Sequence, residues 1–462
     1  MSFNYKTAMK LTMLLLALTI VNFSFAQEST PPQIDQRIYQ IIENTSADRI
    51  EADIRTLANF GTRNTFSDTV SNTRGIGAAR RWIKAEFEKI SVECGDCLEV
   101  FYQKDFVEKT EGSRVPHSAW IVNVVAVLRG TDYPDSYVMM SGDIDSRASN
   151  TMDFEVDAPG ANDNASGMAG TLEAARAMTK FRYKHSVAFV GLSGEEQGLF
   201  GGKGLAKYAK DNNWTMIGIL NNDMIGNIEG VDGVIDNRTF RIFSEPTPAN
   251  ETDRQRGARR FSGVEVDGIS RQLARYIHKQ VKTYMPEMNP MMIYRLDRFG
   301  RGGHHRPFND LGFAGVRIME AHENYNRQHQ NIREENGIKY GDVIEGVNFK
   351  YAKKLTSVNA IAMAGLALAP PAPTDVRIGG AVRPSTVLQW AETDDANIAG
   401  YKLYWRLTTS PTWDNSKYVT GVNTFTLEGI VIDNYYFGVA AVGKDGNESP
   451  VVFPYQQIRR SR

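Results

Sequence analysis

Between Trp120 and Leu368 the sequence alternates short apolar runs with segments of helical period. The apolar runs are Ile121 to Leu128, Ser136 to Ser141, Val187 to Leu192, Met216 to Leu220 and Val316 to Met319. The segment 166–180 instead repeats its apolar residues at helical spacing, as do stretches between residues 34 and 91. Strands that alternate with helices predict an α/β fold, with a mostly parallel mixed sheet flanked by helices.

The chain changes character at residues 369–373, which read Ala-Pro-Pro-Ala-Pro and predict a linker. Short alternating strands at regular spacing follow, which predicts a small all-β sandwich over 374–457. The strings LQW at 388–390, GYKLY at 400–404 and YFGVAAV at 436–442 resemble a fibronectin type III domain. That resemblance implies a module for spacing or for contact with a surface or polymer. The α/β domain is then expected over 27–368.

The first 26 residues have the pattern of a secretory signal peptide. Lys6 and Lys10 precede an apolar run from Leu11 to Val21, and Ser24-Phe25-Ala26 supplies small residues for cleavage after Ala26. The run is too short to span a membrane and no second long apolar segment follows. We therefore expect a secreted or periplasmic bacterial protein without a membrane anchor after cleavage.

Cys94 and Cys97 are the two cysteines of the chain. In an exported protein they predict a local disulfide rather than half of a zinc site, because no second cysteine pair is present. The formal net charge is −1 and no basic stripe stands out, so a nucleic-acid partner is not expected.

Acidic residues follow three of the predicted strands, and another precedes the predicted helix at 166–180. They are Asp143 and Asp145, Glu195 and Glu196, Asp223, and Asp163 before the helix. Ligand sites of open α/β sheets gather at the carboxyl ends of strands, so these acids are expected to converge. Convergent carboxylates repel one another, and a cation relieves the repulsion. With His329 as a nitrogen donor, the set suits zinc or a similar divalent ion.

The order of these motifs resembles the zinc-dependent exopeptidases that include bacterial secreted aminopeptidases, glutamate carboxypeptidase and glutaminyl cyclase. The resemblance covers residues 34–368 and rests on the strings GDIDS at 142–146, PGANDNASG at 159–167, GEE at 194–196, NDMIG at 222–226, and His329. It implies hydrolysis of peptides at a pair of zinc ions.

The resemblance also implies a role for each residue. Asp163 would bridge two zinc ions, Glu196 and His329 would complete the shell of one ion, and Asp143 and Asp223 that of the other. Glu195 would be the general base that activates the metal-bound water. Asp145 would orient a metal ligand.

Position 143 departs from the family, which has His where this chain has Asp143. We favour direct ligation of the second ion by Asp143, since carboxylates bind zinc. The alternatives are a weak or different second metal, and a single metal as in the glutaminyl cyclases.

A second departure places His304 before His305, where relatives have Asp-His. We hypothesise that His304 compensates, as a metal ligand or as a partner of Asp143; the alternative is that both histidines are polar loop residues. Arg298 and Arg301 flank a Gly-rich loop and would suit a substrate carboxylate, although a solvated basic loop is the simpler interpretation.

Four functions are weighed against these patterns. A secreted zinc aminopeptidase acting on peptides is the leading prediction. A mono-zinc acyl transferase like glutaminyl cyclase, or a carboxypeptidase, is the alternative. A non-catalytic binding protein is disfavoured because Glu195, Glu196, Asp163, Asp223 and His329 are all present.

Overall fold

The computed structural model describes residues 34–264 and 266–458. Its larger domain is built on an eight-stranded sheet with the order β1-β2-β4-β3-β5-β8-β6-β7. The strands are β1 (Leu98–Val107), β2 (Ala119–Leu128), β3 (Tyr133–Asp143), β4 (His185–Leu192), β5 (Thr215–Asn222), β6 (Thr239–Ser244), β7 (Asn289–Ile293) and β8 (Gly315–Glu320). Four neighbouring pairs, β3–β4, β3–β5, β5–β8 and β6–β7, are parallel and the other three antiparallel. The predicted mixed, mostly parallel sheet is confirmed.

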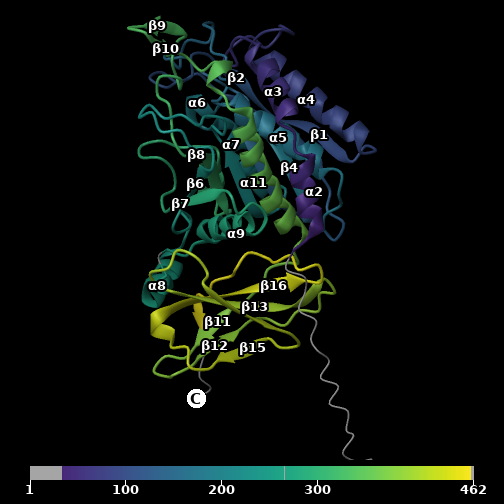
Figure 1. Cartoon of the computed structure of the whole chain (residues 1–462), viewed down its shortest axis with the longest axis vertical. Helices are drawn as coiled ribbons and strands as arrows, with labels where there is room; N and C mark the ends of the chain where they lie inside the picture. The colour runs from purple at the N-terminus through teal and green to yellow at the C-terminus, as the bar shows by residue number, and fades with distance from the viewer. Residues whose placement is uncertain (1–33, 265, 459–462) are drawn as a thin grey trace, which may run out of the picture.

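Helices cover both faces of the sheet (Figure 1). Val138 and Met140 point into a core shared with α2 (Gln36–Asn44), α3 (Ala47–Ala58), α4 (Gly75–Glu93), α5 (Ala165–Met178), α9 (Ile269–Tyr284) and α11 (Phe349–Leu368). Met139 points to the opposite face, against α7 (Phe200–Asp211) and α10 (His305–Asp310). This alternation is the period of two that a strand buried on both faces requires.

The carboxyl ends of β3, β4, β5 and β8 lie at one edge of the sheet because these four strands run parallel. Asp143 ends β3, the one-turn helix α6 (Glu195–Gly198) follows β4, and Asp223 follows β5. In Figure 1, α6 lies at the end of the molecule remote from the C-terminal domain, near the hairpin of β9 (Arg333–Glu335) and β10 (Ile338–Tyr340). The sheet therefore gathers the predicted acids, as expected.

The C-terminal domain is a sandwich of two small sheets. One has the order β15-β12-β11-β17 and the other β14-β13-β16. Their bounds are β11 (Arg377–Gly379), β12 (Thr386–Gln389), β13 (Ile398–Leu407), β14 (Asn415–Val419), β15 (Thr424–Leu427), β16 (Tyr435–Gly443) and β17 (Gln456–Gln457). Trp390, Leu403 and Val439 are buried between them. The predicted sandwich is confirmed, and its kinship with fibronectin type III domains stays a prediction.

Polar contacts, one of them fully buried, join the sandwich to the α/β domain. Asp267, which is fully buried, accepts hydrogen bonds from Arg275 at 2.5 Å and from Arg406 of the sandwich at 2.7 Å. Lys279 of α9 pairs with Glu448 at 2.6 Å. The two domains are thus joined by these contacts as well as by the linker at 369–373.

The predicted disulfide between Cys94 and Cys97 is present and closes the turn between α4 and β1. Across residues 34–264 and 266–458, no helix combines the length and apolar character that crossing a bilayer needs. The predicted signal peptide lies outside the described residues.

Candidate metal centre

Three of the predicted ligands, Asp163, Glu196 and His329, come together at the sheet edge. The Nε2 atom of His329 lies 2.9 Å from Oδ2 of Asp163 and 2.9 Å from Oε1 of Glu196. One ligand atom from each residue falls within 4.8 Å of the other two. His329 adopts a left-handed φ of 55°, a conformation that is uncommon for non-glycine residues.

The charge state of this cluster fits a cation. Burial lowers the pKa of His329, but the charges of Glu196 and Asp163 outweigh burial and raise it to about 9. Without a metal, the cluster therefore holds a proton at neutral pH. Carboxylate oxygens and imidazole nitrogens are also ligand types that bind zinc.

The loop that carries Asp163 is held by a buried carboxylate that the sequence did not single out. Asp342 accepts the backbone N–H of Asp163 at 2.6 Å and that of Asn162 at 2.8 Å. The chain turns into this loop at Gly160, whose φ is +53° and where a Cβ would stand 2.5 Å from the Asp163 carbonyl. A side chain at position 160 would displace the ligand loop.

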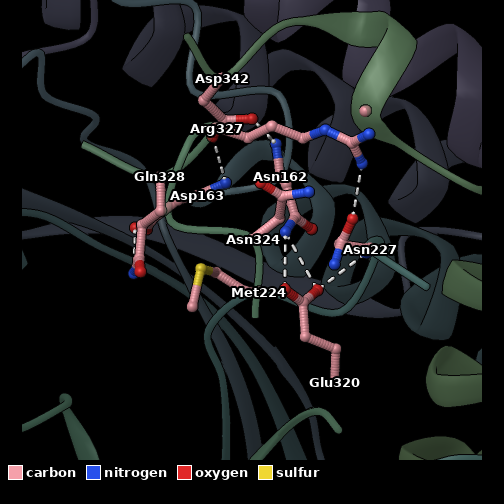
Figure 2. A pocket seen from close by; sticks show the side chains of 10 residues that line it. Asn162, Asp163, Met224, Asn227, Glu320, Asn324, Arg327, Gln328 and Asp342 are labelled. Carbon is pink, nitrogen blue, oxygen red and sulfur yellow. Dashed lines mark hydrogen bonds between the residues drawn. The ribbon is translucent and has the colours of Figure 1, made fainter. Parts of the chain in front are cut away.

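A second buried acid, Glu320 at the end of β8, supports the same loop (Figure 2). It accepts hydrogen bonds from the Asn162 side chain at 3.0 Å and from the Asn227 backbone at 2.8 Å. Burial raises the pKa of Glu320 to about 8 and that of Asp342 to about 7. The loop is therefore braced by two acids that retain protons into the neutral range.

Glu195 and Asp145 lie beside the cluster. Asp145 accepts the backbone N–H of Glu195 at 3.2 Å through one oxygen and that of Glu196 at 3.1 Å through the other. It thus fixes the turn that presents both glutamates, as the resemblance implied. Burial, together with the charges of Glu196 and Asp223, raises the pKa of Glu195 well above its usual range.

Asp223 has a partner that was not foreseen. Its Oδ2 atom lies 2.7 Å from Nη2 of Arg317, whose side chain is fully buried. Arg317 also donates to the Gly302 carbonyl at 2.9 Å and lies 3.3 Å from Asp297. A guanidinium group therefore stands against the carboxylate that the resemblance assigns to the second metal ion.

Asp143 is likewise engaged by protein groups. Its Oδ1 atom lies 2.5 Å from Nδ1 of His304, and its Oδ2 accepts the Asn164 side-chain N–H at 2.8 Å. The hypothesis that His304 partners Asp143 is confirmed. Burial raises the pKa of Asp143 and lowers that of His304 to about 4, which favours a neutral pair that shares one proton.

Of the remaining candidates, His305 is internal, whereas Arg298 and Arg301 are partly exposed and lie beside Glu323. His305 is buried and its Nε2 lies 2.8 Å from the Leu296 carbonyl oxygen. Arg298 pairs with Glu323 at 2.8 Å, and Arg301 lies 3.5 Å from the same carboxylate. The interpretation of both histidines as polar loop residues is wrong, and so is a freely solvated arginine loop, since both arginines share Glu323.

Sequence reasoning missed Arg317, Asp342 and Glu320, because none belongs to a motif. Two signals were available: Arg317 interrupts an apolar strand otherwise made of residues that pack in the core, and Glu320 ends the same strand. Charged residues in a buried strand need a partner, and the partner is supplied by a distant segment.

Known proteins resemble this chain over most of its length. A model of peptidase family M28 matches residues 123–343. A probable zinc metalloprotease of Pyrenophora tritici-repentis is 37% identical over 424 residues, 91% of this chain and 98% of that protein. A probable zinc metalloprotease of Leptosphaeria maculans is 39% identical over 425 residues, 92% of this chain and 98% of that protein.

Solved structures share the fold. The LapA aminopeptidase of Legionella pneumophila superposes with a TM-score of 0.53 at 17% identity, covering 74% of this chain and 78% of that one. LapB of the same organism gives a TM-score of 0.51 at 16% identity, covering 74% and 79%. At such identities the likeness concerns the fold alone.

Proposed function

The chain belongs to peptidase family M28 and is a zinc metallopeptidase, and from this premise we propose that it is an exported aminopeptidase that removes N-terminal residues from peptides. The observation that carries the proposal is the convergence of Asp163, Glu196 and His329 beside Glu195, the neighbour of Glu196 on α6. A zinc ion held by these three residues would lower the pKa of water and polarise the scissile carbonyl.

Glu195 is the general base of this proposal. It stands next to the ligand Glu196 on α6, and Asp145 holds the backbone of both residues. Its raised pKa suits a group that accepts a proton from water and then delivers it to the leaving amine. The positive charge of a metal opposes that rise, and so brings the carboxyl group towards the working pH.

We favour recognition of a free amino terminus over a free carboxyl terminus. The two arginines that would suit a substrate carboxylate, Arg298 and Arg301, already share Glu323. By contrast, Asp223 has a buried carboxylate oxygen, Oδ1, with no hydrogen-bond partner. An ammonium group is the natural complement of such an unpaired acceptor.

We propose one zinc ion per chain rather than the two that the resemblance implies. Asp223 is paired with Arg317, and Asp143 is bonded to His304 and Asn164. The guanidinium group would supply, permanently, the positive charge that a second ion would bring. A second metal at Asp223 would stand beside the buried guanidinium group of Arg317, and the two positive charges would repel each other.

A single metal also keeps a second candidate function open, that of a glutaminyl-cyclase-like acyl transferase. The specific observation in its favour is that, within the described residues, only Asp163, Glu196 and His329 form a group with metal-binding geometry. The two activities differ in product: a peptidase frees an amino acid, whereas a cyclase releases ammonia from an N-terminal glutamine.

Export is proposed from the signal-peptide pattern of the N-terminus and from the Cys94–Cys97 disulfide, since disulfides form and persist in oxidising compartments. The sandwich would then contact a surface or polymer outside the cell. Fractionation with N-terminal sequencing tests this: we expect exported protein beginning at Gln27, and a cytosolic protein that keeps residues 1–26 would refute it.

A panel of matched peptides tests the activity. Each peptide is offered with a free or acetylated amino terminus and with a free or amidated carboxyl terminus. We expect acetylation to abolish cleavage and amidation to leave it unchanged. The reverse pattern identifies a carboxypeptidase, and ammonia release from glutaminyl peptides without new amino acids identifies a cyclase.

A further inference from the structure

An open cavity of about 750 Å³ lies beside the active-site edge of the sheet. It is formed by residues 62–69, the start of α4, the start of β2 and the segment at 154–155. Thr65, one of its lining residues, donates its hydroxyl to Asp145 at 3.1 Å. Asp145 in turn holds the backbone of Glu195 and Glu196, so the cavity wall contacts the support of the catalytic turn.

Arg80 of α4 lines this cavity and lacks a partner for its charge. Its side chain is nearly buried, with 7% of the residue exposed. Its Nε and Nη2 atoms are buried without a hydrogen-bond partner, and no ion pair of Arg80 is found among the described residues. Burial lowers its pKa to about 10, so the guanidinium remains charged at neutral pH.

The other charged side chains that line the cavity are Arg74, Asp68 and Glu155, and among the described residues none of them forms an ion pair with Arg80. Arg74 pairs with Asp157 at 2.7 Å, and the Asp68 carboxylate accepts the backbone N–H groups of Val70 and Ser71. Asp145 favours the charged form of Arg80 from a distance, without a direct contact. An arginine buried beside a cavity without a counter-ion is costly, and a bound anion would remove that cost.

The rest of the cavity wall is partly aromatic and suits the apolar part of an organic anion. The His117 ring lies edge-on to Phe66 at 5.3 Å and to Phe154 at 5.4 Å, so aromatic surface flanks the cavity. An apolar stem with an anionic head would place carbon against the rings and oxygen against Arg80.

We propose that this cavity binds a carboxylate group, and that Arg80 recognises it through the positive charge of its guanidinium group. The carboxylate has two sources: an acidic residue of a peptide substrate, which rests on the proposed function, or a free carboxylate that binds as an effector. Either source would give the protein a preference for acidic molecules.

The first arm of the test compares peptides that carry Glu or Gln at each position beyond the cleaved bond. We expect wild-type protein to prefer Glu at one position, and Arg80→Met to reduce that preference by about tenfold to hundredfold, as for loss of a charge-assisted hydrogen bond. Arg80→Lys keeps part of the preference. Lys89→Met, which removes an exposed charge from the same helix, leaves it unchanged.

The second arm does not depend on peptidase activity. Calorimetry measures binding of glutarate, with the neutral glutaramide as matched control, to the zinc-loaded wild-type protein and to Arg80→Met and Arg80→Lys. Binding of glutarate that is lost in Arg80→Met supports a free carboxylate. A Glu preference in the first arm without glutarate binding supports a substrate residue.

The proposal is overturned if Arg80→Met lowers kcat/KM equally for Glu and Gln peptides and leaves glutarate binding at the wild-type level. That pattern would assign Arg80 a structural role behind Asp145. If no peptide is cleaved at all, the proposed function fails while the calorimetric arm still decides the carboxylate site. Should Arg80→Met not fold, Arg80→Lys is judged by the same two comparisons.

Discussion

Arg317 and Asp223 form a buried ion pair, 2.7 Å between Nη2 and Oδ2, at the position where a two-zinc peptidase would hold its second ion. The pair is set by the sheet, because Arg317 lies opposite Asn221 in the register of β5 and β8 and Asp223 follows two residues later. The side chain of Arg317 therefore supplies a positive charge at this position.

Metal analysis tests this relationship directly. We expect one zinc per wild-type chain, and one zinc in Asp223→Asn, because Asp223 already has a protein cation as its partner. His329→Ala should lose most of the zinc, since His329 contacts both other ligands. Mass spectrometry of dialysed protein measures the ratio; two ions in the wild type, with one lost in Asp223→Asn, would contradict the proposal.

Glu195→Gln tests the base. Removing a general base costs about 10²- to 10⁴-fold in rate, so kcat should fall by that range while zinc content stays at the wild-type level. The substitution preserves size and leaves the backbone contacts with Asp145 in place. Activity close to wild type would exclude Glu195 as the proton carrier.

Glu320→Gln tests how Glu320, which supports the loop that carries Asp163, makes protein stability depend on pH. The folded-state pKa of Glu320, about 8, lies above its ordinary value of 4.5. The folded protein therefore binds the extra proton, and this group's contribution to stability is present at low pH and lost as pH rises towards 8. Glu320→Gln should flatten the decline of the unfolding free energy between pH 5 and 8.

Urea unfolding at several pH values measures that slope. Glu335→Gln, on the exposed strand β9, is the matched control and should keep the wild-type slope. An unchanged slope in Glu320→Gln would show that Glu320 titrates normally in the folded protein.

Arg406→Met tests the attachment of the sandwich. Arg406 and Arg275 share the fully buried Asp267, and loss of one partner of a buried pair costs about 3–5 kcal/mol. We expect a clear fall in the free energy of unfolding. Arg377→Met, which breaks the exposed pair with Asp375, should change little. Equal effects would mean that the interface contributes no more than the surface.

The sequence by itself determined the α/β architecture and identified the residues of the candidate metal centre. Alternating strand and helix periods predict a sheet with helices on both faces, and parallel strands bring their carboxyl ends to one edge, which places Asp143, Glu196 and Asp223 together. The resemblance to the zinc exopeptidases implied that Asp163 and His329 join them.

Only the tertiary structure showed Arg317 against Asp223, and it decided that His304, foreseen as a metal ligand or as a partner of Asp143, is the partner. His304 reaches Asp143 across 161 positions of the chain, and Arg317 reaches Asp223 across 94. Local patterns carry no record of such pairings, because they depend on strand register and on which loop closes over the edge. The sequence therefore revealed that position 143 lacks the histidine of the family. The folded chain showed that His304 contacts Asp143 and that the cation Arg317 contacts Asp223.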